Sequence, residues 1–469
     1  MPKRPQFPNR MLPNGMLPNG MLVALLSAVL LLAGCATTTV HRPTAAHAAP
    51  AFAEARAIAG ALASLPPAER QAGEARIDRL VAQLDDATLA RQAAALPPGD
   101  PLYDFAGRAL LNRGLPLPRP FERNLAANAA RPPAEADGYR PPLHLAVLLP
   151  LSGNLATAAV PVRDGLLAGY YAAQRRRPDI RFYDTAAGVA AAYDRAKAAG
   201  ADFVVGPLGR DEVGRLFGQG TLDVPVLALN RGSVAPPPGS ASFSLAPEDD
   251  GIAAAEYLVA RHAMRTLVLA DGDDGMRRAI AAFREQYQQR GGTVVAELPV
   301  APVPVGMDGA LTAAARAEGG VDAVFLAVRA SQAVALSPQL LSAGLAGKLR
   351  VATSQLGSAS AQDAGGHALD GIAFPSDAWT LRNVPGLPPA TEAASLLASA
   401  RGPAQRLFAF GYDAWLLVAY LDRLAGDPNA SVPGATGRLR LDGFGNIVRT
   451  PAWSTWSGES TVPLGDAGG

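Results

Sequence analysis

Residues 145–173, LAVLLPLSGNLATAAVPVRDGLLAGYYAA, contain the pattern that decides the fold. The run from His144 to Leu149 is short and mostly apolar, which is typical of a strand buried on both faces. The turn Pro150-Leu151-Ser152-Gly153 ends this run, and an Ala-rich stretch over 160–176 follows. A buried strand followed by a helix is the first half of a βαβ unit, so the stretch predicts a parallel sheet.

The same alternation continues as far as residue 374. Apolar strands that alternate with helices imply parallel sheets covered by helices on both faces. Nine strands exceed one typical doubly wound sheet, so we expect an α/β domain of two lobes with a cleft between them. The predicted strands are 144–149, 180–183, 203–206, 226–229, 266–270, 293–299, 323–328, 350–353 and 371–374, and the predicted crossover helices are 160–176, 187–199, 248–263, 277–290, 307–318 and 332–343.

The N-terminus has the features of a lipoprotein signal peptide. Three positive residues precede an apolar run from Met21 to Leu32, which is about half the ~20 residues that a membrane-spanning helix needs. Small residues then precede Cys35, the only cysteine of the chain. We expect residues 1–34 to be removed and Cys35 to carry lipid. An ordinary signal peptide with an incidental cysteine is the alternative, and the chain could start at Met11, Met16 or Met21.

Residue 36 is Ala, not the Asp that retains lipoproteins of enteric bacteria at the inner membrane, so the outer membrane is favoured by that group's sorting rule. A single cysteine cannot form a disulfide within the chain. The formal charge of +1 gives no basic excess for displacing counterions, which argues against nucleic-acid binding. Composition therefore favours an envelope protein that folds by packing alone.

Between the anchor and the lobes the chain changes character twice. Residues 35–50 are small and polar and predict a flexible tether, and 51–113 carry apolar residues at helical spacing, which predicts a small all-helical domain of about four helices. Residues 114–142 are Pro-rich and predict a semi-rigid linker, or an extended arm packed along the next domain. The two-lobed domain would cover 143–460, followed by a disordered tail over 461–469.

Several stretches resemble a known family. Residues 145–173, ADFVVGPLGRDEVGRLF (201–217) and VPVLALN (224–230) are similar to the opening of the type I periplasmic-binding-protein fold. RLFAFGYDAWLLVAYLDRL (406–424) followed by GATGRLRLDGFGNIVRTPAWSTW (434–456) resembles the LpoA type of outer-membrane lipoproteins, which activate class A penicillin-binding proteins. The resemblance implies a non-catalytic protein whose two-lobed domain docks a peptidoglycan synthase of the inner membrane and stimulates its transpeptidase. It implies no cofactor.

One departure from that family concerns length. Its better-known members carry a long N-terminal domain of stacked helical hairpins, whereas this chain has about 80 residues there. Residues 36–50 and 114–142 total 44 residues, and an extended chain spans at most ~3.3–3.6 Å per residue. The upper limit is roughly 150 Å, so reach across the periplasm would depend on these segments.

Signatures of catalysis and metal binding are weak. The five histidines are scattered, and neither a Gly-x-Ser-x-Gly elbow nor an HExxH motif occurs. In Asp271-Gly272-Asp273-Asp274-Gly275 the last position would have to be Asp or Asn for a calcium loop, so we expect these Asp residues to cap a helix that begins near Met276. We therefore predict neither an enzyme nor a metal site.

A ligand-binding lipoprotein, either a transport receptor or a periplasmic sensor, is the alternative function. In two-lobed α/β folds ligands bind where loops at the carboxyl ends of the strands face the cleft. The hydroxyl clamp and covering aromatic of amino-acid-binding relatives are missing here, although Arg210 and Arg231 could bind an acidic group. The candidate cleft residues are Ser152, Asn154, Arg210, Asn230, Arg231, Asp271 and Arg329.

Two aromatic groups lie near the C-terminus. Phe408, Tyr412 and Trp415 share one helical face, which predicts core packing. Trp453 and Trp456 are expected to flank a turn and to be partly exposed.

Overall fold

The computed structural model describes residues 49–113, 115–119, 121, 131–220, 222–237, 239–358, 365–427, 429–442 and 444–465. The predicted signal peptide, the lipidation of Cys35 and nearly all of the predicted tether lie outside these residues. Within the described part, no helix is both long and apolar enough to cross a membrane.

The helical N-terminal region has the four helices that the apolar spacing predicts. They are α2 (Pro50–Ala61), α3 (Pro67–Ala82), α4 (Asp86–Ala95) and α5 (Tyr103–Asn112), with the short η1 (Leu62–Ser64) after the first. Asp85 caps α4 by accepting a hydrogen bond from the backbone N–H of Thr88. Burial of apolar side chains holds the helices together, and these side chains include Phe52, Ile77, Leu89, Leu102 and Leu110.

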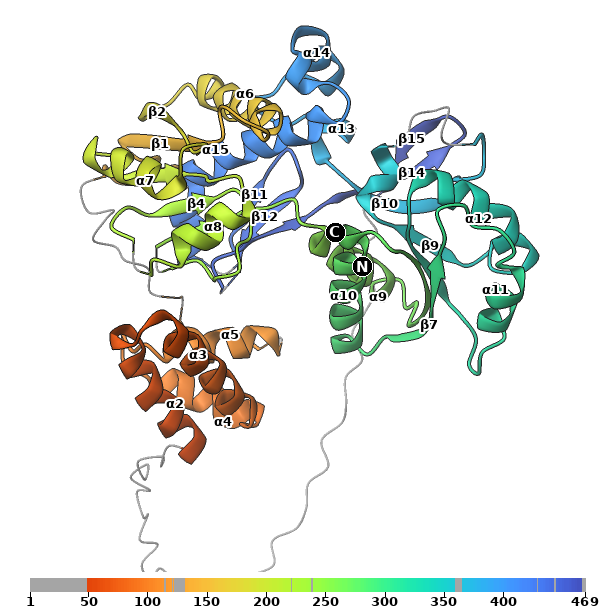
Figure 1. The fold of residues 1–469 in the computed structure, drawn as a ribbon, viewed down its shortest axis with the longest axis horizontal. Helices are drawn as coiled ribbons and strands as arrows, with labels where there is room; N and C mark the ends of the chain where they lie inside the picture. Colours follow the sequence, from red (N-terminus) through yellow and green to blue (C-terminus); the bar gives the residue numbers. More distant parts are fainter. Residues whose placement is uncertain are drawn as a thin grey trace, which may run out of the picture. The chain divides into compact units, whose positions relative to one another are not determined.

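Lobe 1 is a parallel sheet of order β2-β1-β3-β4-β5. Successive residues of β1 point to opposite faces: Leu145 and Val147 pack under α6 and α15, and Ala146 and Leu148 pack under α7 and α8. The sheet is thus covered on both faces, as predicted (Figure 1). The elements are β1 (His144–Leu149), β2 (Asp179–Asp184), β3 (Phe203–Val205), β4 (Val226–Ala228), β5 (Ala241–Ser242), α6 (Ala156–Ala172), α7 (Val189–Ala198), α8 (Arg210–Phe217) and α15 (Ala404–Gly426).

Lobe 2 is a seven-stranded sheet of order β15-β14-β10-β9-β8-β6-β7. Strands β6 to β10 pair in parallel, and β14 and β15 add an antiparallel edge. Helices α9 and α10 pack on one face and α11 and α12 on the other. The elements are β6 (Arg265–Asp271), β7 (Thr293–Val300), β8 (Ala323–Ala327), β9 (Leu349–Ala352), β10 (Ile372–Ser376), β14 (Ala452–Ser457), β15 (Ser460–Pro463), α9 (Pro247–Val259), α10 (Asp274–Gln289), α11 (Asp308–Ala315) and α12 (Ala330–Ser342).

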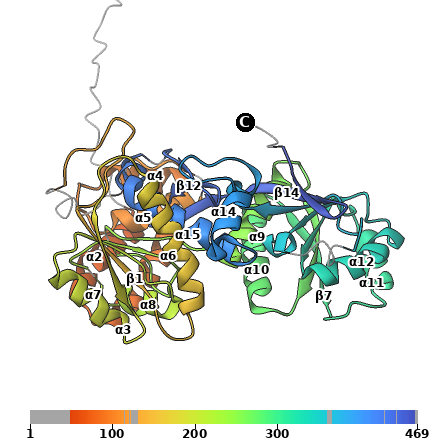
Figure 2. The same ribbon diagram turned by 90° about the horizontal axis from the view of Figure 1, so that it is seen from above.

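The two lobes lie side by side, with α6 and α15 in one and α10 and α12 in the other (Figure 2). The order of elements along the chain makes it pass between them three times. The first crossing joins β5 to α9, the second joins β10 to α13 (Ala378–Leu381), and the third joins β13 (Ile447–Thr450) to β14. Trp379 of α13 stacks on Phe408 of α15, which places α13 with lobe 1. The antiparallel sheet β11-β12-β13 also lies with lobe 1, because Asn446 forms a β-bridge with Ser242 of β5. Its other strands are β11 (Val432–Pro433) and β12 (Arg438–Leu441), and the remaining short helices are η3 (Ser354–Ser358), α14 (Ala390–Leu396) and η4 (Ala398–Ala400).

Helices α6 and α15 cross at glycines. A Cβ atom on Gly165 would lie 1.9 Å from the carbonyl oxygen of Phe408, and one on Gly411 would lie 2.0 Å from that of Val162. Backbone therefore meets backbone at this crossing, so packing leaves no room for a side chain at Gly165 or Gly411. This crossing seats the long apolar helix α15 in the core of lobe 1.

All nine predicted strands of the lobes are confirmed, with ends that differ by one or two residues. Short elements escaped prediction: α8, α13, α14, β5 and the five C-terminal strands. Core packing of Phe408, Tyr412 and Trp415 is confirmed, since all three are buried. For the other tryptophans the predicted partial exposure is confirmed at Trp453, which packs on Tyr257 with ring centroids 4.1 Å apart, and wrong at Trp456, which is buried. Both lie on β14.

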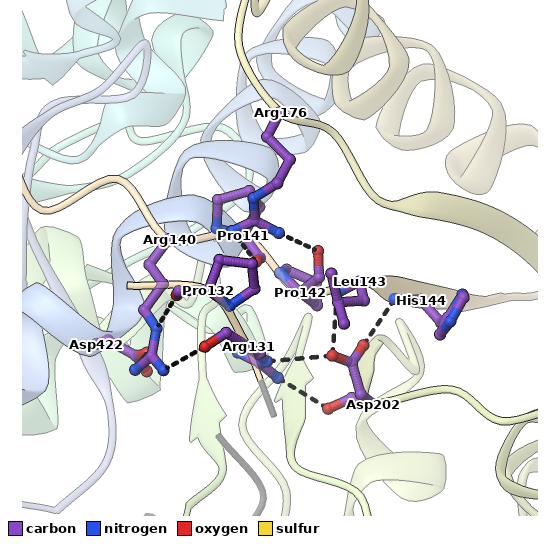
Figure 3. Close-up of polar contacts among 10 residues, drawn as sticks. All are labelled: Arg131, Pro132, Arg140, Pro141, Pro142, Leu143, His144, Arg176, Asp202 and Asp422. Carbon is purple, nitrogen blue, oxygen red and sulfur yellow. Dashed lines mark hydrogen bonds and ion pairs between the residues drawn. The ribbon is translucent and has the colours of Figure 1, made fainter. Parts of the chain in front are cut away.

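Residues 131–142, called the arm here, pack against lobe 1, as in the second of the two interpretations of the Pro-rich stretch. Asp202 is the main contact (Figure 3). Its carboxylate accepts hydrogen bonds from the backbone N–H groups of Leu143 (2.9 Å) and His144 (2.8 Å) and from Nε of Arg131 (3.2 Å). The Arg131 side chain is only 3% exposed and also donates to the Asp202 carbonyl oxygen at 2.8 Å.

The rest of the arm is bound along α15 and the end of α6. Arg140 donates to the Pro132 carbonyl (2.9 Å) and pairs with Asp422 (3.2 Å), while its backbone N–H donates to the Ala419 carbonyl (2.8 Å). Buried Tyr139 donates to the Arg176 carbonyl at 2.9 Å. The arm is therefore fixed to lobe 1 along its whole length.

The other end of the Pro-rich stretch contacts the helical region. Nη1 of Arg119 donates to the Leu96 carbonyl at 2.7 Å, and its backbone N–H donates to Tyr103 Oη at 3.0 Å. The Phe121 ring lies 5.9 Å from that of Tyr103, centroid to centroid.

Candidate functional site

The predicted cleft residues follow the strands of both lobes, as the fold requires. Ser152, in the loop after β1, donates to the Asp184 carboxylate at 2.6 Å. The same carboxylate accepts from the backbone N–H of Leu151 (3.0 Å), and these contacts lower the pKa of Asp184. Ser152 and Asn154 line a cavity of about 260 Å³ together with Thr185 and Arg215. The hydroxyl of Ser152 is thus already engaged within the loop.

The loops after β3 and β4 are also held by internal contacts. Asn230 donates to the Leu208 carbonyl at 3.0 Å and accepts from the backbone N–H of Arg231 at 2.9 Å. Arg210 is the first residue of α8 and is exposed. The Arg231 guanidinium, in contrast, pairs with the Asp249 carboxylate at 2.8 Å and is therefore already engaged within the protein.

In lobe 2 the predicted helix cap is confirmed. Asp273 accepts hydrogen bonds from the backbone N–H groups of Gly275 and Met276 at the start of α10. Asp271 pairs with Arg329 at 3.4 Å, so these two predicted cleft residues do meet. Among the described residues no group of three or more His, Cys, Asp or Glu side chains could hold a metal ion.

Charged side chains gather where the chain crosses between the lobes. Arg231, Arg406 and Arg449 come from lobe 1, Asp249 and Asp250 from the first turn of α9 in lobe 2, and Asp377 from the second crossing. We call these six residues the hinge cluster. Their formal charges cancel, as three cations face three anions.

Asp250 is the centre of the hinge cluster. Its Oδ2 accepts hydrogen bonds from the backbone N–H (2.9 Å) and the hydroxyl (2.5 Å) of Ser354, and Nη1 of Arg406 donates to that same hydroxyl. Its Oδ1 lies 3.9 Å from nitrogens of both Arg406 and Arg449. Arg449 also lies 3.9 Å from Asp377. A cavity of about 300 Å³ adjoins these groups, lined by Asp250, Ser354 and Arg406 and by apolar residues such as Met276 and Leu407.

Burial dominates the electrostatics of the hinge cluster. It raises the pKa of Asp249 and of Asp377 despite the nearby arginines. Burial also opposes the charge of Arg406, but Asp377, Asp250 and Asp249 more than compensate and raise its pKa. Burial therefore works against the ionised forms of Asp249 and Asp377, whereas the neighbouring acids favour the charged form of Arg406.

Asp413 of α15 is a further carboxylate of lobe 1 and is fully buried. It accepts hydrogen bonds from the backbone N–H groups of Ala435 (2.5 Å) and Thr436 (2.8 Å) and from the Thr436 hydroxyl (2.6 Å). Burial nevertheless raises its pKa to about 7. The carboxylate ties α15 to the turn before β12.

Reasoning from the sequence found Arg231 but missed the other five members of the hinge cluster. Asp249 and Asp250 lie in PEDDG at a helix start, where acidic residues are common, so their pattern gave no signal of burial. Arg406 and Arg449 lie in the two C-terminal stretches that carry the resemblance, and this position is a signal that could have identified them as candidates.

Comparison with known proteins matches this architecture. The family described as "LppC putative lipoprotein" matches residues 139–305 and 302–458. Two curated relatives, each named penicillin-binding protein activator LpoA, come from Photobacterium profundum and Pasteurella multocida; each is 27% identical, over 69% and 68% of this chain. The matched segments cover only 57% and 54% of those relatives.

A solved structure supports the fold. The C-domain of LpoA (YraM) from Haemophilus influenzae, described as a regulator of PBP1A, matches with a TM-score of 0.58 and 22% identity, over 68% of this chain and 99% of that one. At this identity the match establishes the two-lobed fold. The family model, by contrast, spans both lobes from the arm to β14, well over half of the chain. The chain therefore belongs to the LppC family.

Proposed function

We propose that this chain is a non-catalytic activator of a class A penicillin-binding protein, a peptidoglycan synthase. The observation that carries the proposal is the continuous match of both lobes to the LppC family, together with relatives named as activators of penicillin-binding proteins. Those relatives are longer than this chain, and the shared part is the two-lobed domain. We therefore assign the contact with the synthase to this domain.

The cleft geometry favours an interaction protein over a receptor or an enzyme. The residues at the positions where a ligand would bind already have partners within the protein: Ser152 donates to Asp184, Asn230 to the Leu208 carbonyl, Arg231 pairs with Asp249, and Arg329 pairs with Asp271. An activator of this kind works by binding the active conformer of its partner more tightly than the inactive one, so the free energy of the interface shifts the equilibrium. It needs no cofactor.

We further propose that lipid on Cys35 anchors the chain in the outer membrane, facing the periplasm. The support is the apolar run followed by small residues and a single cysteine. The Cys35→Ser variant should lose fatty-acid labelling and partition into the soluble fraction, while the parent stays with the outer membrane. Equal membrane association of parent and variant would disprove the anchor.

The direct test is a cross-linking assay. Chain Ala36–Gly469 is added to the purified class A synthase of the same organism, and cross-linked muropeptides are quantified. A solute-binding protein of the same fold is the control. We expect cross-linking to rise with the chain and not with the control. Absence of both binding and stimulation at micromolar concentrations would refute the proposal.

The same purified chain can be used to distinguish the activator from the alternative function, a ligand-binding lipoprotein. A small metabolite present at a free concentration of about 100 times its Kd would raise the free energy of unfolding by ~2.7 kcal/mol, which thermal unfolding detects easily. Saturable stabilisation by such a metabolite, without stimulation of the synthase, would favour the receptor.

A further inference from the structure

We propose that the hinge cluster is a latch that fixes the opening between the two lobes, with Arg406 as its main element. The lobes of such a fold are joined only by the three crossings, so their relative rotation depends on what else connects them. In this chain lobe 1 supplies three arginines that converge on one turn of a lobe 2 helix. The inference goes beyond the proposed function and does not depend on it.

The arginines of lobe 1 contact helix α9 from two sides. Asp249 and Asp250 are successive residues of α9, so their side chains leave the helix axis about 100° apart. Asp249 binds Arg231 of the loop after β4, whereas Asp250 faces Arg406 of α15 and Arg449 of β13. A rotation of lobe 2 that relieves one contact therefore strains the other.

Arg406 also connects to a second part of lobe 2. Its Nη1 donates to Ser354 Oγ, and Ser354 in turn donates twice to Asp250. Ser354 follows β9, at the carboxyl end of the lobe 2 sheet. This series of hydrogen bonds, from Arg406 through Ser354 to Asp250, thus connects the two lobes across the cleft with the protein's own side chains.

The energetics suit a latch better than a source of stability. Within the described part of the chain, four buried atoms of the cluster have no hydrogen-bond partner: Arg231 Nε, Asp249 Oδ2, Asp250 Oδ1 and Arg449 Nε. Buried ion pairs with incomplete hydrogen bonding add little net stability, because desolvation offsets the attraction between the charges. Their effect is to specify one arrangement, since any other leaves a buried charge without its partner.

The test measures the distance between the lobes directly. Cys35 is the only cysteine, so the chain carrying Cys35→Ala accepts a unique pair of spin labels. Suitable sites are Tyr171→Cys on α6 of lobe 1 and Leu341→Cys on α12 of lobe 2, which are 68% and 69% exposed. Electron–electron dipolar spectroscopy then reports the distribution of distances between the labels.

We expect a single narrow distribution in the parent and a broader one, shifted to other distances, in Arg406→Ala. The control is Arg401→Ala, because the Arg401 guanidinium donates to the Ala394 and Ser395 carbonyls, which are not part of the hinge cluster, and it should match the parent. An unchanged distribution in Arg406→Ala overturns the proposal. If Arg406→Ala does not fold, Ser354→Ala serves as the second test, because it removes only the hydroxyl that bridges Arg406 and Asp250. A distance distribution of Ser354→Ala that is identical to that of the parent again overturns the proposal.

Discussion

Replacement of Arg131 by Ala tests whether the arm is part of the lobe 1 fold. The guanidinium makes two hydrogen bonds to Asp202, at 3.2 Å and 2.8 Å, and lies 5.4 Å from the centre of the Phe203 ring. Hydrogen bonds to charged groups contribute about 1.5–3 kcal/mol net. Removal of one partner of a fully buried ion pair costs ~3–5 kcal/mol. Asp202 is partly exposed and keeps the N–H groups of Leu143 and His144, so the loss stays below that range.

We therefore expect Arg131→Ala to lower the free energy of unfolding by about 2–3 kcal/mol. Tryptophan fluorescence during urea unfolding is the assay, because all four tryptophans (Trp379, Trp415, Trp453 and Trp456) lie in the lobes and none in the helical region. The free energy follows from the midpoint and the slope of the transition.

Arg277→Ala is the control for Arg131→Ala. Arg277 forms an exposed ion pair with Asp274, and such pairs contribute at most ~1 kcal/mol. If Arg131→Ala moves the unfolding midpoint no further than Arg277→Ala does, the arm is not a structural part of lobe 1.

Two further predictions concern the core of lobe 1. Gly165→Ala should destabilise the fold by about 1–3 kcal/mol or more, because its Cβ would lie 1.9 Å from the Phe408 carbonyl oxygen. The control is Gly309→Ala on α11, where nothing lies within 4 Å of the new Cβ, and it should be neutral or stabilising by up to ~1 kcal/mol. Equal effects of the two substitutions in urea unfolding would contradict the close helix crossing. The pKa of Asp413 is raised to about 7 from 3.8, so as the pH falls the folded state binds a proton at Asp413 before the unfolded state does. Protonation of Asp413 therefore adds to the free energy of unfolding between pH 7 and pH 4, and this contribution is lost above pH 7. Asp413→Asn should be less stable overall but lack this increment, and an identical pH slope in parent and variant would refute the assignment.

How much of the fold could be read from the sequence depended on the length and burial of each element. Strand β1 is buried on both faces, so its apolar run stood out. Strand β12 reads Arg-Leu-Arg-Leu over four residues and pairs only within a small sheet, so the alternation was too short to predict it.

The site was less predictable for a different reason. The positions of Arg231, Asp271 and Arg329 in cleft loops followed from the order of strands. Their partners did not: Asp250 meets Arg406 and Arg449 only after 156 and 199 further residues have folded back (250 to 406, and 250 to 449). Arg131 likewise meets Asp202 across 71 residues, and Pro-rich composition alone is equally consistent with a free linker.

The docked arm changes how far the chain can extend. Because 115–119 and Phe121 contact the helical region and 131–142 contact lobe 1, only residues 122–130 lie between the two. Nine residues span at most ~30 Å in any conformation, and residues 36–49 add at most ~50 Å. The upper limit on contour length outside the folded parts therefore falls from roughly 150 Å to about 80 Å. If Cys35 is anchored in a membrane as proposed, the distance from that membrane to the lobes is set mainly by the folded parts, because the segments between them contribute at most about 80 Å.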